Sequence, residues 1–284
     1  IQGGKKMTKQ KVAIPSFKDM KKEGKKIRMV TAYDYHTAAL VDQADIEMIL
    51  VGDSLAMVML GYDSTVGVTM EDMIHHIKPV VKGAPNTIII GDMPFGSYNV
   101  SCEQAVINAT RLMKEGGCDC IKLEGGLAVA DKVEAIVKAG IPVIGHIGLT
   151  PQTSSQLGGF KVQGKNIEDA KRIVEEAKAL EKAGAFMVVI ECVPSAIGKL
   201  ISESIYIPTI GIGAGPDCDG QVLVTHDMMG MYGKFTPKFV KKYANLSEII
   251  INAFNQYSEE VQSGSFPDEK YSFGMKEEVL KKLY

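Results

Sequence analysis

The sequence predicts an α/β fold, a (β/α)8 or TIM barrel with extra helices after the last strand. Three observations favour this fold. The chain has 284 residues, which is an ordinary length for a single barrel domain. Eight short apolar runs alternate with longer helical patterns. Over most of their length these runs lack polar alternation, as expected for parallel strands that are buried on both faces.

The eight expected strands follow one another along most of the chain. Most are rich in Val and Ile and end in Gly, Asp, Glu or His. Their ranges are 27–32, 47–52, 87–92, 120–125, 141–148, 186–192, 207–213 and 221–226. Strands that alternate with helices at this spacing indicate a parallel sheet with right-handed crossovers. An open, doubly wound sheet is the alternative, but no GxGxxG follows the first strand, which disfavours its dinucleotide-binding form.

Helical patterns fill most of the connections. The clearest is 166–183, where apolar residues recur at spacings of three and four and Gly184 follows as a C-terminal glycine. Segments 102–115 and 128–139 behave similarly. The connection 213–220 differs, because it can hold little more than one helical turn.

The C-terminal part of the chain is expected to add helices to the barrel. Residues 236–284 contain two or three helical patterns, including 246–262 and 275–284, which would cover one end of the barrel or reach a partner subunit. No Pro/Ser-rich linker precedes them, so a single domain over 1–284 is expected. The first six residues precede Met7, which resembles a natural start, and they are interpreted as an addition outside the fold.

Composition excludes several classes of protein. Hydrophobic residues make up 45% and charged residues 23%, which is the balance of a soluble globular protein. The formal net charge of −2 argues against a nucleic-acid partner. No apolar run approaches the roughly 18 residues of a membrane span, and the polar start does not resemble a secretory signal. The five scattered cysteines indicate reduced thiols, so a cytoplasmic location is expected.

Three carboxylates end expected strands, namely Asp53, Asp92 and Glu124. In barrels the active site is built at the C-terminal ends of the strands, so we expect these side chains to converge. They would repel one another unless a cation held them, and oxygen ligands suit Mg²⁺. Helix capping is the alternative for Asp53. Asp63 is interpreted as a turn residue.

Lys122 and Glu124 form the most informative pair. They lie two apart in a strand and therefore project from one face, whereas Ile121 and Leu123 face the other way. A charged pair inside a barrel is costly unless it is paired or bound to a ligand. The pair therefore indicates either a ligand site or a structural ion pair.

Two further residues at strand ends are candidates for proton transfer. Glu191 fits a general acid or base, and a helix cap or a partner for a basic residue is the alternative. His146 is a further candidate, and a satisfied core histidine is its alternative. His75 and His76 lie in an expected helix and are interpreted as structural. The glycine-rich run 211–215 fits either an anion-binding turn or a tight turn after a strand.

Longer strings around these positions resemble the ketopantoate hydroxymethyltransferase family. They occur in the family's order from residue 31 to about residue 273, and their number makes a chance match improbable. The strings are TAYDY (31–35), VGDSL (51–55), DST (63–65), VT (68–69), GAPN (83–86), DMPFGSY (92–98), KLEGG (122–126), PVIGHIGLTPQ (142–152), GGFKVQG (158–164), LEKAGAFMVVIECVP (180–194), IPTIGIGAG (207–215), DGQVLVTHD (219–227) and SGSFP (263–267).

The chain departs from the family pattern at a few positions. Ala56 replaces a glycine, Tyr62 replaces a histidine and Phe160 replaces a tyrosine. The tail 275–284 extends beyond the pattern. None of these departures touches a ligand position.

The resemblance implies a barrel enzyme that transfers a hydroxymethyl group from 5,10-methylenetetrahydrofolate to 3-methyl-2-oxobutanoate. The product would be 2-dehydropantoate, a precursor of pantothenate and coenzyme A, and Mg²⁺ would stabilise an enolate. The resemblance also implies a homo-oligomer, often a decamer, without nucleic-acid or membrane partners. Family roles carry over as follows: Asp53, Asp92 and Glu124 match metal-binding positions, Asp53, Ser54, Asp92 and Lys122 match substrate-binding positions, and Glu191 matches the proton acceptor.

Two other functions are alternatives to hydroxymethyl transfer. A Mg²⁺-dependent lyase or mutase of the phosphoenolpyruvate mutase and isocitrate lyase group would share the metal and the enolate chemistry, but the lyase-type KKCGH motif is absent. A barrel that has lost catalysis would not be expected to keep the acidic residues and Lys122 together.

Overall fold

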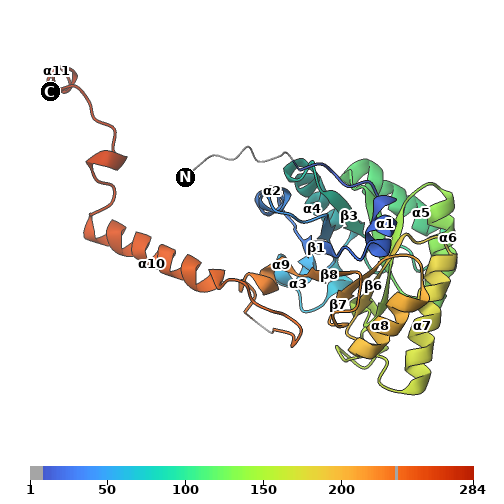
Figure 1. The fold of residues 1–284 in the computed structure, drawn as a ribbon. Coiled ribbons are helices and arrows are strands. Elements are labelled where there is room, and N and C mark those ends of the chain that lie inside the picture. The colour runs from blue at the N-terminus through green and yellow to red at the C-terminus, as the bar shows by residue number, and fades with distance from the viewer. Residues whose placement is uncertain (1–8, 234–235) are drawn as a thin grey trace. The chain divides into compact units, whose positions relative to one another are not determined.

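The computed structural model describes residues 9–233 and 236–284. Eight parallel strands close into a barrel in the order β1 to β8, and helices surround it (Figure 1). The strands are β1 (Ile27–Thr31), β2 (Met48–Val51), β3 (Ile88–Asp92), β4 (Cys120–Glu124), β5 (Val143–Gly148), β6 (Met187–Glu191), β7 (Thr209–Ile212) and β8 (Gly220–Leu223). Seven expected strand ranges contain the observed strand, and the eighth, 221–226, overlaps β8, which begins one residue earlier and ends at Leu223. The predicted barrel is therefore confirmed and the open sheet is excluded.

Helices and short helical turns follow most strands. They are α1 (Ser16–Lys22), α2 (Tyr35–Gln43), α3 (Leu55–Val58), η1 (Thr65–Gly67), α4 (Met70–Gly83), α5 (Cys102–Arg111), η2 (Leu112–Gly116), η3 (Leu127–Val129), α6 (Ala130–Lys138), η4 (Pro151–Thr153), α7 (Ile167–Lys182), α8 (Ser195–Ser204) and α9 (Thr225–Met228). The connection from β7 to β8 contains no helix, in agreement with the short segment noted in the sequence.

Helix α7 shows how the sequence sets an element's bounds. The Asn166 side chain accepts a hydrogen bond of 2.8 Å from the Asp169 N–H, which caps the first turn. At the other end Gly184 adopts a φ of +96°, a conformation that suits glycine after a helix. A Cβ atom on Gly145 would lie 2.5 Å from Leu180, so this glycine lets α7 pack closely on β5.

Side chains alternate between two apolar regions. Outward residues of the strands pack against the helices in one cluster, which includes Ile121 and Leu123. Inward residues fill the barrel together with Phe17 from α1. Lys122 and Glu124 are buried on the inward face, as their spacing predicts.

The described chain separates into two compact units. One holds residues 9–225 and 237–240 and contains the barrel. The other holds residues 226–233, 236 and 241–284, and includes α10 (Leu246–Ser263), η5 (Glu269–Tyr271) and α11 (Glu277–Leu280). Both expected C-terminal helices are present, and α11 is the shorter of the two. A single domain over 1–284 stays a prediction, and the expectation for the first six residues lies outside the described residues.

None of the helices in the described residues is long and apolar enough to cross a membrane.

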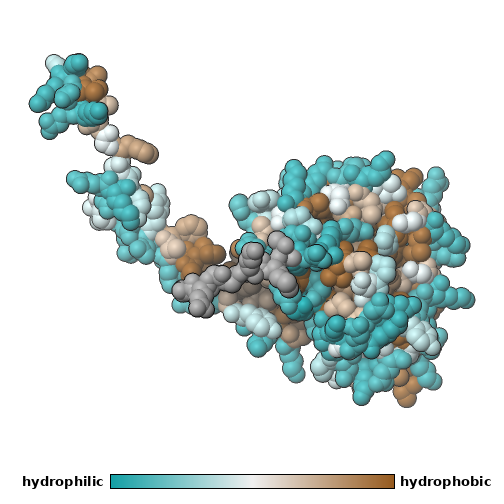
Figure 2. Space-filling view, turned by 45° about the horizontal axis from the view of Figure 1, so that its top comes forward, coloured by the Kyte–Doolittle hydropathy of each residue, from teal (hydrophilic) through white to brown (hydrophobic). Residues whose placement is uncertain are grey.

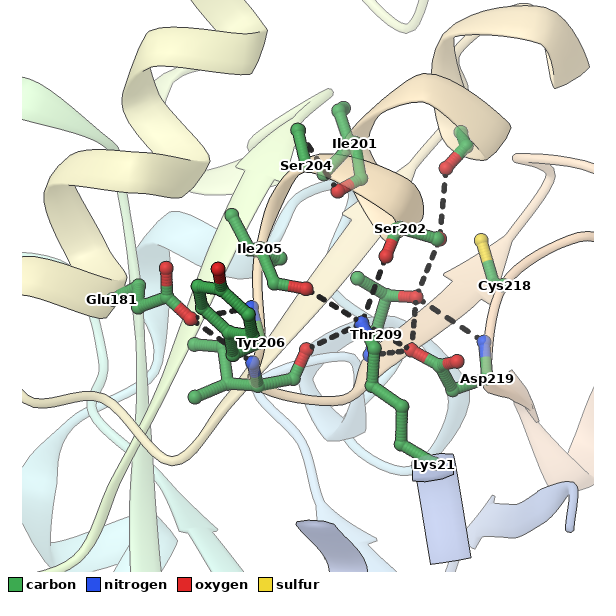
Figure 3. A network of polar contacts seen from close by, with 12 residues as sticks. Lys21, Glu181, Ile201, Ser202, Ser204, Ile205, Tyr206, Thr209, Cys218 and Asp219 are labelled. Carbon is green, nitrogen blue, oxygen red and sulfur yellow. Dashed lines mark hydrogen bonds and ion pairs between the residues drawn. The ribbon is translucent and has the colours of Figure 1, made fainter. Parts of the chain in front are cut away.

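A polar network ties α1 to residues near β7 and β8 (Figure 3). The Lys21 ammonium lies within 3.0 Å of the backbone oxygens of Ser202, Ile205 and Ile207. It also lies 3.0 Å from Asp219 Oδ2. That carboxylate accepts hydrogen bonds from the backbone N–H and hydroxyl of Thr209. One lysine therefore connects the first helix to the last two strands of the barrel.

We expect Lys21→Met to lower the free energy of unfolding by about 2 kcal/mol. The substitution leaves Asp219 and three carbonyl groups without their ammonium partner, and the estimate is reduced from that of a fully buried pair because both side chains are partly exposed. Chemical denaturation would measure the change. Lys22→Met is the matched control, because Lys22 is 68% exposed and should change stability by less than about 0.5 kcal/mol. Equal effects of the two substitutions would contradict the role of Lys21.

Candidate active site

Inward-facing polar residues gather at the C-terminal ends of four neighbouring strands. The strand register places Asp92 of β3 beside Lys122 of β4. It also places Glu124 of β4 beside His146 of β5. At the end of β5, Gly148 lies beside Glu191 of β6. Because these residues share the inward parity of their strands, their side chains meet inside the barrel. The first four are buried, and the Glu191 side chain is 15% exposed.

Lys122 lies among the acidic side chains. Its Nζ is 2.9 Å from Asp92 Oδ1 and 3.7 Å from Glu124 Oε1. Burial lowers the pKa of Lys122, but the surrounding carboxylates outweigh this effect and raise it above its usual value. The lysine is therefore a fixed positive charge. The structural ion pair considered from the sequence is present, and it belongs to a larger cluster at the end of the barrel where active sites form.

His146 connects two carboxylates. Its Nδ1 lies 3.3 Å from Glu124 Oε1 and its Nε2 lies 3.1 Å from Glu191 Oε2. Burial and the charge of Lys122 lower the pKa of His146, but hydrogen bonds to the two glutamates outweigh them and raise it to about 9. At neutral pH this shift favours the imidazolium, in which each ring nitrogen carries a proton and lies within ion-pair distance of one glutamate oxygen. Its Nδ1 also lies 3.3 Å from Lys122 Nζ, which is a contact between like charges.

Asp53 joins the cluster from the loop after β2. Its backbone N–H donates to Asp92 Oδ2 over 3.0 Å, and its Oδ2 accepts from Gln152 Nε2 over 2.9 Å. No side-chain cap is formed at the start of α3, so the capping alternative for Asp53 is wrong. Burial and the negative charges of Asp92 and Glu124 raise the pKa of Asp53 well above its usual value.

The other two acids respond differently to the same environment. Burial is the largest cause that raises the pKa of Asp92, and Lys122 only partly opposes it. Burial also acts to raise the pKa of Glu124, but the hydrogen bond from His146 and the charge of Lys122 lower it overall. The negative charges of Asp53 and Asp92 are therefore disfavoured, whereas His146 and Lys122 stabilise the negative charge of Glu124.

The cluster holds more negative than positive charge when its groups are ionised. Four carboxylates face one ammonium and one imidazolium, so two negative charges are uncompensated. Among residues 9–233 and 236–284, no three His, Cys, Asp or Glu side chains are already arranged as a metal site. Lys122 and Gln152 instead contact the aspartate oxygens. The cluster therefore offers the charge and the oxygen atoms that a divalent cation needs, without a complete cage.

Two polar residues of the cluster were not singled out from the sequence, Gln152 in η4 and Tyr98 in the loop after β3. Both are buried. The Tyr98 hydroxyl donates to Gln152 Oε1 over 2.6 Å, and the Gln152 backbone N–H donates to Glu124 Oε2 over 3.0 Å. Each residue follows the C-terminal end of a strand by only a few residues. This position is the one feature of the sequence that could have indicated a place in the site.

Ser54 stands beside the cluster at the start of α3. Its hydroxyl lies 2.7 Å from the Tyr33 hydroxyl, and Tyr33 is itself buried. The Ser54 side chain is therefore oriented by a residue that follows β1.

The ends of β5 and β6 approach each other closely beside Glu191. Gly148 adopts a φ of +89°, and a Cβ atom there would lie 2.3 Å from the Glu191 carbonyl oxygen. Cys192 follows with a φ of +48°, an uncommon conformation for a residue with a side chain. These two backbone positions allow β6 to end with Glu191 beside His146.

The remaining sequence candidates lie apart from these contacts. His75 and His76 are on α4 as predicted, and His76 Nδ1 lies 2.7 Å from the Tyr33 carbonyl oxygen. Asp63 is exposed in a loop. The run 211–215 begins in the last two residues of β7 and continues into a tight turn, in which Gly213 has a φ of +66°. This turn lines a surface hollow of about 500 Å³ that shares no residue with the cluster.

Comparisons with known proteins identify the family of this chain. Residues 11–269 match the family model described as ketopantoate hydroxymethyltransferase. A protein of Heliobacterium modesticaldum named 3-methyl-2-oxobutanoate hydroxymethyltransferase is 60% identical over 275 residues, which cover 97% of this chain and 99% of that protein. A protein of Enterococcus faecalis with the same name is 59% identical over 95% of this chain and 98% of its own length.

Solved structures with a similar fold have much lower sequence identity. A phosphonopyruvate hydrolase gives a TM-score of 0.59 at 13% identity, over 97% of this chain and 94% of that chain. A 2,3-dimethylmalate lyase of the PEP mutase/isocitrate lyase superfamily gives 0.56 at 13% identity, over 95% and 98%. These likenesses concern the fold alone, whereas the family match spans nearly the whole sequence. The chain is therefore an enzyme that belongs to the ketopantoate hydroxymethyltransferase family.

Proposed function

We propose that this enzyme transfers a hydroxymethyl group from 5,10-methylenetetrahydrofolate to 3-methyl-2-oxobutanoate and forms 2-dehydropantoate for pantothenate synthesis. The observation that carries the proposal is the buried carboxylate cluster with its uncompensated charge, in a chain of this family. The reaction breaks the C3–H bond of the oxo acid and the two C–N bonds that hold the one-carbon unit on the folate. It forms a C–C bond to that unit, water supplies the new hydroxyl group, and tetrahydrofolate leaves. The carbon acid is weak, so its ionisation needs both a base and nearby positive charge.

The cation in this proposal is Mg²⁺, held by Asp53 and Asp92 with Glu124 beside them. The two aspartates are the groups whose pKa values are raised, because burial and mutual repulsion disfavour their charged forms. A divalent cation would offset the two surplus negative charges of the cluster. When bound, it would supply Lewis acidity that stabilises negative charge on the keto oxygen of the substrate.

The chain's own residues would perform the remaining steps. Lys122 places a buried positive charge beside the substrate anion. Ser54, whose hydroxyl is oriented by Tyr33, would bind the substrate carboxylate. Glu191 would accept the C3 proton. The neighbouring imidazolium of His146 keeps the Glu191 carboxylate oriented.

The direct test is turnover of 3-methyl-2-oxobutanoate with 5,10-methylenetetrahydrofolate. We expect activity that EDTA abolishes and added Mg²⁺ restores, because a cation must offset the charge of the aspartates. Product formation, followed chromatographically, is the measurement. Activity that survives EDTA would contradict the metal, and folded protein without activity in either condition would favour an oxo-acid lyase or mutase reaction.

Glu191→Gln should lower turnover by about 10²-fold or more, because the amide cannot accept the proton. The fold should be unchanged, since Gln keeps the size of the side chain and still accepts a hydrogen bond from His146. Steady-state kinetics with a circular dichroism check would measure this. Glu203→Gln is the matched control on α8, where the side chain is 66% exposed. Near-full activity of Glu191→Gln would exclude Glu191 as the base.

The active form is proposed to be a homo-oligomer, a decamer by family resemblance. Helix α10 supports assembly, because none of its 18 residues is buried. Its residues Ile250, Phe254, Tyr257 and Val261 are exposed at spacings of three and four, which is the pattern of a helix face that packs against protein. Hydrophobic residues on the surface of α10 are visible in Figure 2.

Phe254→Asp should reduce the molecular mass of the assembly, since a charge on this helix face opposes its burial. Light scattering would give the mass, which for a decamer is ten times that of the 30.7 kDa chain. Asn252→Asp is the control, because residue 252 lies on the opposite side of the helix. An unchanged mass for Phe254→Asp would show that this face is not an interface.

A cytoplasmic location is proposed as well. The five cysteines are free thiols, and free thiols are usual where glutathione and thioredoxin keep cysteines reduced.

A further inference from the structure

Gln152 bonds to two of the three carboxylates that the proposed function assigns to the cation. Its backbone N–H donates to Glu124 Oε2 over 3.0 Å, and its side-chain Nε2 donates to Asp53 Oδ2 over 2.9 Å. The same Nε2 donates to the Met93 carbonyl oxygen over 3.0 Å. One residue of the loop after β5 thus restrains carboxylates that come from the ends of β2 and β4.

The surroundings of Gln152 permit only one orientation of its amide. When Asp53 is ionised, as it would be while holding a cation, both groups near Nε2 are acceptors, so a flipped amide would place its oxygen against a carboxylate and a carbonyl. On the other side Tyr98 Oη lies 2.6 Å from Gln152 Oε1. The Tyr98 hydroxyl accepts from the Glu124 backbone N–H over 3.3 Å. Its one proton faces two acceptors, Gln152 Oε1 at 2.6 Å and the Glu124 carbonyl oxygen at 3.2 Å, and the shorter contact is the one to Gln152.

Tyr98 is suited to remain a donor. It is 1% exposed, and burial, followed by the charges of Glu124 and Asp92, raises the pKa of its hydroxyl. The hydroxyl therefore keeps its proton in the presence of the carboxylates. A hydrogen bond between groups this buried is costly to lose, because the remaining partner stays shielded from solvent.

We propose that Tyr98 and Gln152 are positioning residues for the cation, with Tyr98 orienting the Gln152 amide and Gln152 holding the Asp53 and Glu124 carboxylates. This inference rests on the proposed function, since it assumes that these carboxylates receive a divalent cation. Groups that orient metal ligands in this way typically contribute 10- to 100-fold to metal affinity. Tyr98 contacts the Glu124 backbone directly, but it reaches the Asp53 carboxylate only through Gln152, and this dependence separates positioning from a general structural role.

The test uses Mn²⁺ as the probe, with the full-length protein and no oxo acid or folate. Electron paramagnetic resonance of free Mn²⁺ gives the dissociation constant for the wild type, Tyr98→Phe, Gln152→Ala and the double variant. Tyr98→Phe removes one hydroxyl from a buried ring and is expected to weaken binding about tenfold. Gln152→Ala is expected to weaken it at least as much. The double variant is expected to bind like Gln152→Ala alone, because Tyr98 has nothing left to orient.

Matched controls report on general effects of each substitution. Tyr206→Phe removes a hydroxyl from a side chain that is 80% exposed, and Gln43→Ala truncates an exposed glutamine. Both should bind Mn²⁺ like the wild type. Thermal unfolding of all variants shows whether each one is folded at the temperature of the titration.

The possible results separate the inference from the function on which it rests. Wild-type affinity in a folded Tyr98→Phe protein would overturn the inference and leave the metal site intact. Losses that multiply in the double variant would also overturn it, since the two residues would then act independently. A wild type that binds no Mn²⁺ would overturn the cation itself, and the inference with it.

Discussion

The organisation of this site depends on an excess of buried negative charge. Asp53, Asp92 and Glu124 are removed from water at the C-terminal end of the barrel, where isolated carboxylates are strongly disfavoured. The fold places Lys122 and His146 among them, on strands whose inward parity leaves no other direction for these side chains. The two cations compensate part of the charge, and the remainder makes the cluster receptive to a positively charged ligand.

Much of the fold could be predicted because each strand is encoded locally. Runs such as 87–92 and 186–192 combine β-branched residues with a polar terminal residue, and both became barrel strands. Strand parity alone also predicts that Lys122 and Glu124 lie on one face, as they do in the barrel. The absence of a helix between β7 and β8 is predictable for a similar reason, because the length of the connection 213–220 limits what it can form.

The contacts within the site were less predictable, because they depend on distances between strands. Sequence spacing could not show that His146 bridges Glu124 and Glu191, since these residues come from three strands. Gln152 and Tyr98 were missed for the same reason. Tyr98 lies in an irregular loop and Gln152 in a single short helical turn, η4. Neither segment has a periodicity that shows which way a side chain points, and their roles follow only from a buried network.

The pairing of β1 with β8 has a consequence for how the chain is made. Ile27 lies opposite Gly220, and Lys21 reaches Ser202 and Asp219. A ribosome that adds about 5–20 residues per second exposes the first strand for roughly ten seconds or longer before its last neighbour emerges. During that interval the inward side chains of β1 have no closed barrel around them. The N-terminal segment is thus the part of the nascent chain with the longest need for protection from aggregation, and a chaperone that acts during translation would be most useful there.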